Sequence, residues 1–410
     1  MEALWGVLVV AAGGLLMGSG AWPFKLMKKY QFEHWWFVGM FVGLVAMPWA
    51  ITLLGCPHAV QSLCGIPWYA ILVGNLFSVG WGIANVLCGI CYVRIGVALT
   101  GAILAGLGVS VGAITPMIFK GSGRFQDAAD VTSPAGLTVC LAVALMLLGV
   151  VMASLAGFGR DRELQKVSTT SGGFLAGLIM TVIAGILSSF MAFVFVYSQY
   201  PIVANLSVVE PGMTIKITTD DPAAGASGDY MVGTDGQLAF GGGSFDVGGL
   251  TAWETGSLLG SAAGAASGPA ADVRVETGSI PATFGVFAIG LIGGALVNLG
   301  YAAYLMTRRR SWHVLLHSGW ELALATVIGI NFSLAVALMG KGMLLLGALG
   351  ASVGFGIQQA MQMTGTQLLG FISGEWRGVH GRPRHQMYVA LAILFVAAAV
   401  MAYGNSLAKS

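Results

Sequence analysis

The chain has 410 residues, of which 56% are hydrophobic and only 9% are charged. A soluble domain carries about 25% charged residues, so the composition excludes a cytosolic enzyme, a nucleic-acid-binding protein and a secreted disulfide scaffold. The formal net charge of +2 implies no strongly acidic or basic partner. The composition therefore predicts an all-α integral membrane protein whose main solvent is the lipid bilayer.

Ten apolar runs approach or exceed the roughly 20 residues that a membrane-spanning helix needs. They are 3–22, 35–55, 67–92, 95–116, 135–158, 173–199, 282–306, 317–339, 343–372 and 385–405. No basic segment precedes the first run, so we expect a span there rather than a signal peptide. The third and ninth runs are long and interrupted by glycines, so they are expected to tilt or break.

The basic residues are distributed unequally between the two sets of predicted loops. Thirteen lie in the odd-numbered loops: Lys25, Lys28, Lys29, Arg94, Arg160, Arg162, Lys166, Arg308, Arg309, Arg310, Arg377, Arg382 and Arg384. The short loops and tail on the other side hold four: Lys120, Arg124, Lys341 and Lys409. Because short cytoplasmic loops carry the excess of Lys and Arg, we expect both termini to face the periplasm of a bacterial inner membrane. The indoles at span ends are expected in the membrane interfaces: Trp35, Trp36, Trp68, Trp312 and Trp376.

The predicted organisation is spans 1–6 in residues 1–199, an extracytoplasmic loop at 200–281, and spans 7–10 in residues 282–410. The loop changes composition toward Gly, Ala, Ser and Asp. Alternating residues at 213–217 predict a strand, and Asp235-Gly236 between apolar arms predicts a two-residue hairpin. A flexible Gly/Ala/Ser tether is expected at 256–271. This small β-rich insertion is interpreted either as a lid over a transport path or as an inert insertion.

Cysteine and metal-ligand patterns give little sign of cofactor chemistry. Cys56 and Cys64 fall in one short outside loop, where a disulfide is possible but not required, and Cys88-Gly-Ile-Cys91 is interpreted as helix packing. The chain contains no Gly-x₄-Gly-Lys-Ser/Thr loop. No cofactor, resident metal, nucleic acid or obligatory protein partner is expected.

Two octapeptides at equivalent places in the predicted halves share five of eight residues. They are Ala105-Gly-Leu-Gly-Val-Ser-Val-Gly112 and Gly347-Ala-Leu-Gly-Ala-Ser-Val-Gly354. Ten spans divide into five plus five, and an odd number of spans per half inverts the second half. An inverted repeat of this kind is an architecture that many secondary carriers use.

Several segments resemble the bacterial L-rhamnose–proton symporter family, a branch of the drug/metabolite transporter superfamily. They are Trp22-Pro-Phe-Lys25 with Lys28-Lys29, Pro48-Trp-Ala-Ile51, Trp81-Gly-Ile-Ala-Asn85, Thr115-Pro116, Glu375-Trp376 and Gly381-Arg-Pro383. The resemblance implies a ten-helix carrier that imports a rhamnose-like monosaccharide with a cation, H⁺ or Na⁺. An exporter of the same superfamily is the first alternative. A membrane-embedded sugar or lipid transferase is the second, and the short basic loops, poor in acidic residues, disfavour it.

Polar side chains within spans are costly in lipid, so each is a candidate for function. In span 3, Asn75, Ser78, Gly82 and Asn85 fall on one helical stripe that Trp81 borders. Amides exchange hydrogen bonds with sugar hydroxyls, and an indole covers a sugar's C–H face, so a sugar site and interhelical hydrogen bonding are both open here. Span 9 carries Gln358, Gln359 and Gln362, which favour a polar cavity.

Further candidates complete the expected site. Substrate contact is also expected from Ser19, Trp22, Ser188 and Asn331. Glu321 is the one carboxylate clearly inside a predicted span, and His313 and His317 precede it by eight and four residues on what is expected to be one helical face. Glu321 with His317 is therefore interpreted either as a proton relay or as an interfacial ion-paired face. A metal site formed by these three residues is less favoured.

Overall fold

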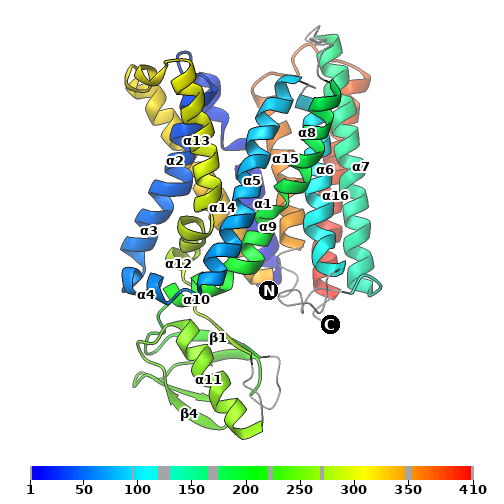
Figure 1. Ribbon diagram of the computed structural model, residues 1–410. Coiled ribbons are helices and arrows are strands. Elements are labelled where there is room, and N and C mark those ends of the chain that lie inside the picture. The colour runs from blue at the N-terminus through cyan, green and yellow to red at the C-terminus, as the bar shows by residue number, and fades with distance from the viewer. Residues whose placement is uncertain are drawn as a thin grey trace. The chain divides into compact units, whose positions relative to one another are not determined.

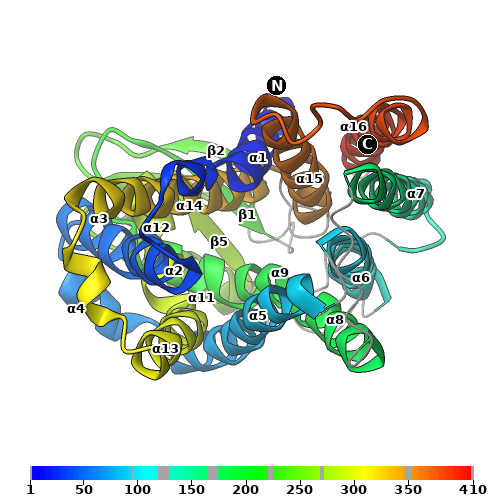
Figure 2. The same ribbon diagram turned by 90° about the horizontal axis from the view of Figure 1, so that it is seen from above.

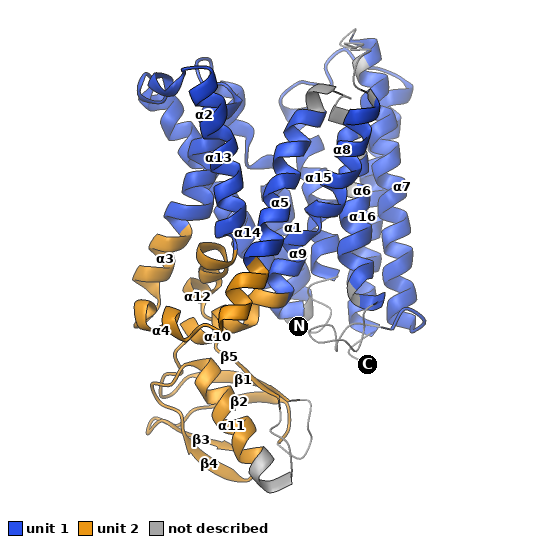
Figure 3. Ribbon diagram, viewed as in Figure 1, with its two compact units in different colours: residues 1–47, 75–196, 291–410 blue, residues 48–74, 197–290 orange. Residues whose placement is uncertain are grey.

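The computed structural model describes residues 2–94, 97–118, 130–164, 174–219, 225–267, 272–346 and 353–407. The protein is mostly helical (Figure 1). Predictions that concern Lys120, Arg124, Lys166, Lys409 or most of the second octapeptide lie outside these residues. The chain groups into two compact units (Figure 3), unit 1 with residues 1–47, 75–196 and 291–410 and unit 2 with residues 48–74 and 197–290.

Seven helical stretches in the described residues are long and apolar enough to cross a membrane, or eight if one bent pair is a single span. They are Leu4–Leu26, Phe32–Gly55, Trp68–Cys91, Pro134–Arg160, Leu175–Leu206, Gly319–Leu346 and Arg382–Leu407, with Ile280–Gly290 and Ile292–Arg308 as the pair bent by 57°. The protein is therefore a multi-pass membrane protein. The expected spans at 95–116 and 343–372 include residues outside the described ranges, so ten spans stay a prediction.

Unit 1 contains most of the long helices. These are α1 (Glu2–Ser19), α2 (Phe32–Phe41), most of α5 (Trp68–Arg94), α6 (Val97–Ile118), α7 (Pro134–Glu163), α8 (Phe174–Ser188), α9 (Phe190–Val194), α13 (Ile292–Arg308), α14 (Gly319–Leu346), α15 (Phe355–Ile372) and α16 (Arg382–Leu407). Short 3₁₀ turns, η1 (Trp22–Leu26) and η6 (Trp312–Leu316), follow α1 and α13. The π-helical segment η2 (Val42–Ala46) continues α2.

Helix α1 packs between α14 and α15 (Figure 2). Glycines make this packing possible, because a Cβ at Gly13 would lie 2.8 Å from the Ala335 carbonyl oxygen on α14 and one at Gly14 would lie 2.5 Å from the Gln358 carbonyl oxygen on α15. Lipid gives helices no hydrophobic drive to associate, so such small residues let backbones approach closely. Helix α14 continues to Leu346, past the expected end of span 8 at residue 339, and Gly342 packs against α1 within it.

Unit 2 contains α3 (Met47–Gly55, from residue 48), α4 (Ala59–Gly65), the first turns of α5, η4 (Phe195–Gln199, from residue 197), α10 (Tyr200–Leu206), α11 (Ala252–Ser267), α12 (Ile280–Gly285) and η5 (Val286–Gly290). It also contains the strands β1 (Thr214–Thr219), β2 (Gly228–Met231), β3 (Gln237–Phe240), β4 (Gly243–Asp246) and β5 (Val273–Glu276). The antiparallel sheets have the orders β2-β1-β5 and β3-β4. Ile215 and Ile217 of β1, at the expected strand, are fully buried.

Two expectations about this region are wrong. The expected tether at 256–271 is largely helix α11, which runs to Ser267. Thr251 and Glu254 form a capping box in which each side chain accepts the other's backbone N–H at 3.1 and 2.9 Å, and Ala is the strongest helix former. The two-residue hairpin lies at Gly241-Gly242 between β3 and β4, not at Asp235-Gly236, because both glycines adopt the positive φ that such turns require.

Three smaller predictions also need correction or comment. Both Cys56 and Cys64 are free, so the structure gives no disulfide between them. The ring of Trp376 is buried and stacks on Phe371 at 5.0 Å, so it packs within the protein rather than facing lipid. Trp68 and Trp312, by contrast, are exposed.

Candidate functional site

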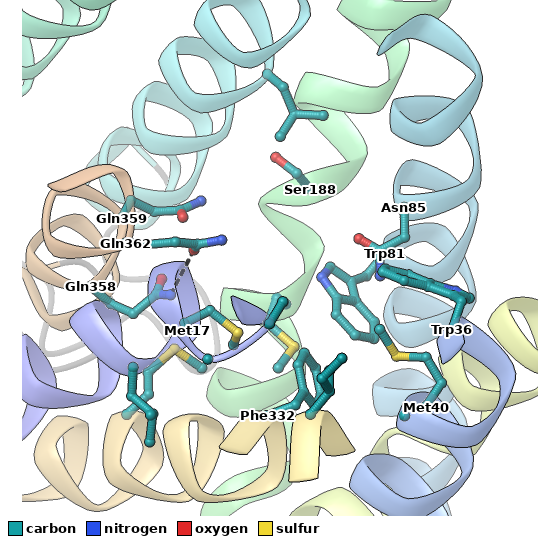
Figure 4. Close-up of a pocket in the computed structure, with 18 of the residues that line it drawn as sticks. Met17, Trp36, Met40, Trp81, Asn85, Ser188, Phe332, Gln358, Gln359 and Gln362 are labelled. Atoms are coloured by element: carbon teal, nitrogen blue, oxygen red, sulfur yellow. Dashed lines mark hydrogen bonds between the residues drawn. The ribbon is translucent and has the colours of Figure 1, made fainter. Parts of the chain in front are cut away.

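Unit 1 contains a cavity of about 270 Å³ that α1, α2, α5, α14 and α15 line together with single residues from α6, α8 and α9 (Figure 4). Drug-sized ligands occupy sites of about 300–1,000 Å³, so this volume suits a smaller molecule. The lining residues are Leu16, Met17, Gly20, Ala21, Trp35, Trp36, Gly39, Met40, Trp81, Asn85, Leu104, Ser188, Met191, Ile328, Phe332, Met339, Phe355, Gln358, Gln359 and Gln362.

One wall of the cavity is an amide surface on α15. Gln358 is almost fully buried, and its Nε2 donates to Oε1 of Gln362 at 2.9 Å. Gln359 points into the same space (Figure 4). Each amide carries two donor hydrogens and one acceptor oxygen, so the bond between Gln358 and Gln362 uses only part of their hydrogen-bonding capacity. The close contact between the backbones of Gln358 on α15 and Gly14 on α1 sets the position of this wall.

The facing wall is aromatic, with one amide (Figure 4). Trp81 and Asn85 come from α5, and the Trp81 ring stacks on Phe332 of α14 at 6.3 Å. Trp36 of α2 donates its indole N–H to Oδ1 of Asn298 at 3.2 Å, which holds the ring in place. The cavity thus presents hydrogen-bonding groups on one side and flat apolar rings on the other.

The structure brings together six of the ten residues expected to contact substrate: Trp81, Asn85, Ser188, Gln358, Gln359 and Gln362. The other four lie elsewhere. Ser19 and Trp22 line a separate, mainly apolar groove between α1, η1 and α15. The Nδ2 group of Asn331 donates to the Gly20 carbonyl at 2.9 Å, which ties α14 to the end of α1.

Asn75 and Ser78 cap the broken helix α13. The residue before α13, Leu291, has no side-chain acceptor for the first backbone N–H groups of the helix. Asn75 Oδ1 accepts the Gly293 N–H at 2.8 Å, and Ser78 Oγ accepts the Gly294 N–H at 2.7 Å. The polar residues predicted to share one face of α5 therefore have two different roles. Asn75 and Ser78 cap α13, whereas Asn85 lines the cavity.

The Glu321 carboxylate anchors the loop between η1 and α2. Its oxygens accept the backbone N–H groups of Lys28 at 3.0 Å, Lys29 at 3.1 Å and Tyr30 at 2.6 Å, and the side chain is 5% exposed. The expected helical face with His317 is wrong, because residues 312–316 form a 3₁₀ turn and α14 begins only at Gly319. His317 is exposed, and its Nδ1 lies 2.6 Å from the His313 carbonyl oxygen.

Sequence reasoning missed the residues that α1, α2 and α14 contribute, among them Met17, Met40 and Phe332. Trp36, which the sequence analysis expects in the membrane interface, lines the cavity instead. A usable signal was present on α2, since Trp36, Gly39 and Met40 recur at the helical spacing that places them on one face. Methionine and phenylalanine in an apolar run give no comparable signal, because they are also the ordinary residues of helix packing.

The fold and the cavity define a polytopic helical membrane protein with an internal polar site. The chain belongs to the L-rhamnose-proton symport protein family, whose model matches residues 1–209. L-rhamnose-proton symporters from Yersinia pestis bv. Antiqua (strain Antiqua) and from Yersinia pseudotuberculosis serotype O:1b (strain IP 31758) are each 30% identical to it over 171 residues, covering 42% of this chain and 48% of theirs. The chain therefore spans about half the length of these curated relatives. No solved structure matches it.

Proposed function

We propose that the protein is a secondary active transporter that imports a rhamnose-like monosaccharide together with a proton. The observation that carries the proposal is the cavity in which the amides of α15 face Trp81 and Asn85 of α5. Amides can exchange hydrogen bonds with hydroxyls, and an indole ring can cover the apolar C–H face of a pyranose. Membership of a family of symport proteins supports transport rather than enzymatic chemistry.

Two parts of the chain support the proposal to different degrees. The matched residues 1–209 include α1, α2 and α5, which carry Trp36, Trp81 and Asn85. The glutamines of α15 lie beyond the match, so their assignment to sugar binding rests on this chain's own geometry. Proton symport of L-rhamnose is what the relatives' names state, and we extend it to this chain as part of the proposal.

The proposal includes a membrane arrangement. It has ten spans as a five-plus-five inverted repeat of the drug/metabolite transporter superfamily, divided as residues 1–199, 200–281 and 282–410. Both termini face the periplasm, and the strand-containing segment lies on that side of the inner membrane. The excess of basic residues in the odd-numbered loops supports this orientation.

Uptake into sealed proteoliposomes tests the function. The purified protein is reconstituted and offered labelled L-rhamnose, L-fucose, D-glucose and D-xylose, with and without an inward proton gradient. We expect accumulation of the rhamnose-like sugar that depends on the gradient and collapses with a protonophore. Accumulation driven only by a Na⁺ gradient would show that Na⁺, not the proton, is the coupling ion. Efflux without gradient-driven uptake would favour the exporter.

A further inference from the structure

A buried histidine stands at the start of α2, where the function proposed above assigns it no role. His34 is 1% exposed. Its Nδ1 accepts the backbone N–H of Gln31 at 3.0 Å, and its Nε2 lies 3.1 Å from the carbonyl oxygen of Ser311. A backbone N–H can only donate and a carbonyl can only accept, so these partners place the ring's single proton on Nε2. His34 is thus a neutral cap on the first turn of α2.

The groups around His34 come from four elements. On α2 the neighbouring Glu33, fully buried, accepts the Arg309 guanidinium from the end of α13 at 2.9 Å. The Tyr30 ring, in the preceding loop, lies 5.6 Å from the imidazole. Burial, and then the charge of Glu321 on α14, raise the pKa of Tyr30, so Tyr30 stays neutral. An additional proton on His34 would therefore be carried by the residue next to Glu33, whose carboxylate is paired with Arg309.

The same helix forms part of the cavity wall. Trp35, Trp36, Gly39 and Met40 follow His34 directly on α2 and line the cavity. Helix α2 is tied to α13 through Trp36 and Asn298, and His34 ties it to Ser311 just after α13. The described part of the wall is built from amide, hydroxyl, thioether, aromatic and aliphatic side chains. A titrating group that influences this wall must therefore act through an adjoining element such as the first turn of α2.

We propose that His34 is the positioning residue through which proton binding is coupled to the sugar cavity, an inference that rests on the proposed proton symport. The transported proton adds to Nδ1, which then becomes a donor facing the Gln31 N–H, another donor. The Gln31–His34 hydrogen bond breaks and the first turn of α2 loses its cap. The indole side chains of Trp35 and Trp36, which follow directly on α2, shift with it. Release of the proton on the other side restores the cap.

Asparagine at this position tests the proposal, because its Oδ1 can accept the Gln31 N–H while the amide cannot titrate near neutral pH. His34→Asn and His34→Gln are reconstituted beside His385→Asn, a control for an exposed histidine on α16. We expect His34→Asn to exchange internal for external L-rhamnose at equal pH within about twofold of the unmodified protein, and its accumulation driven by a proton gradient to fall at least about tenfold. His385→Asn should retain both activities.

A second measurement starts from the unmodified protein, whose result does not depend on any variant folding. Sugar added to the unmodified protein in weakly buffered detergent solution, between about pH 6 and about pH 8, should change the number of bound protons, and this change should disappear in His34→Asn. Full gradient-driven accumulation by both His34 variants would overturn the proposal, as would sugar binding without proton exchange in the unmodified protein. Failure of the unmodified protein to transport any sugar would instead contradict the proposed function.

Discussion

At the scale of single residues, the two amides that face each other across the cavity have the most direct consequence. Asn85→Leu and Gln358→Leu keep the approximate side-chain size but leave a bound sugar hydroxyl without a partner. An unpaired buried polar group costs about 1–3 kcal/mol, and each 1.4 kcal/mol is about a factor of ten in affinity. We therefore expect each substitution to weaken sugar binding by about ten- to a hundredfold, measured by isothermal titration or by tryptophan fluorescence.

Gln367 provides a matched control for this experiment, because it lies on the same helix α15 and is not among the residues that line the cavity. Gln367→Leu should leave the affinity within about twofold of the unmodified protein. Equal weakening by all three substitutions would show a general loss of folded protein. No weakening by Asn85→Leu or Gln358→Leu would remove the amide wall from the binding site.

The anchoring carboxylate makes a different prediction. Glu321→Gln leaves one acceptor oxygen where the carboxylate has two that accept three backbone N–H groups. We expect the melting temperature of the detergent-solubilised protein to fall, and gradient-driven accumulation and exchange to decline by the same proportion. Exchange that survives while accumulation fails would instead support a proton-carrying role for Glu321 itself.

At the scale of elements, Asn75 and Asn85 show how one residue type serves two purposes on one helix. Asn75→Leu removes the acceptor for the Gly293 N–H at the start of α13, and an orphaned buried N–H costs about 1–3 kcal/mol. We expect a lower melting temperature and an unchanged sugar affinity, the reverse of Asn85→Leu. Normal stability of Asn75→Leu would mean that α13 finds another cap.

The division of the α5 stripe also shows what the sequence could and could not predict. Hydropathy and spacing place Asn75, Ser78 and Asn85 on one face, but the break at Leu291 that requires two of them as caps depends on a helix more than 200 residues away along the chain. The position of the α15 glutamines in a polar cavity was easier to predict, because three amides within five residues have few other uses in an apolar helix. Helix α11 runs against its Gly/Ala/Ser composition, which predicts a flexible tether, and the Thr251–Glu254 capping box is the sequence signal that indicates a helix there.

At the scale of the whole molecule, the orientation in the membrane can be tested with the native cysteines. Cys64 is exposed, whereas burial raises the pKa of the Cys56 thiol to about 11. The thiolate is the reactive form, so at about pH 8 only about one Cys56 in a thousand carries it. A membrane-impermeant maleimide should label Cys64 in right-side-out vesicles, and the label should be lost in Cys64→Ser. Labelling only in inside-out vesicles would show that Cys64 lies on the cytoplasmic side and that the chain crosses the membrane in the opposite orientation.

The strand-containing segment gives a second test at this scale. Its buried core, which includes Ile215, Leu238 and Leu259, is largely made by the segment itself, while α10 and α12 pack on each other where Leu206 meets Gly285. Replacing residues 208–277 with a short Gly/Ser linker should leave a monodisperse membrane protein by size-exclusion chromatography. Intact protein without uptake would support the lid, and aggregated protein would show that the segment is needed for folding.

The glycine contacts of α1 have a mechanical consequence. Where backbone touches backbone, no side-chain rotamer can change to let one helix slide past the other, so α1, α14 and α15 form a stiff block. The strain of an alternating cycle must then be absorbed by elements that meet through long side chains or irregular turns. Helix α2 joins the block at Gly39 and Gly43, since a Cβ at Gly329 on α14 would lie 2.6 Å from the Gly39 carbonyl oxygen and one at Gly43 would lie 2.8 Å from the Gly329 carbonyl oxygen. Its histidine-capped first turn lies outside these contacts. We expect spin labels on the first turn of α2 and on α15 to report distance changes during the cycle, and labels on α1 and α15 to report almost none.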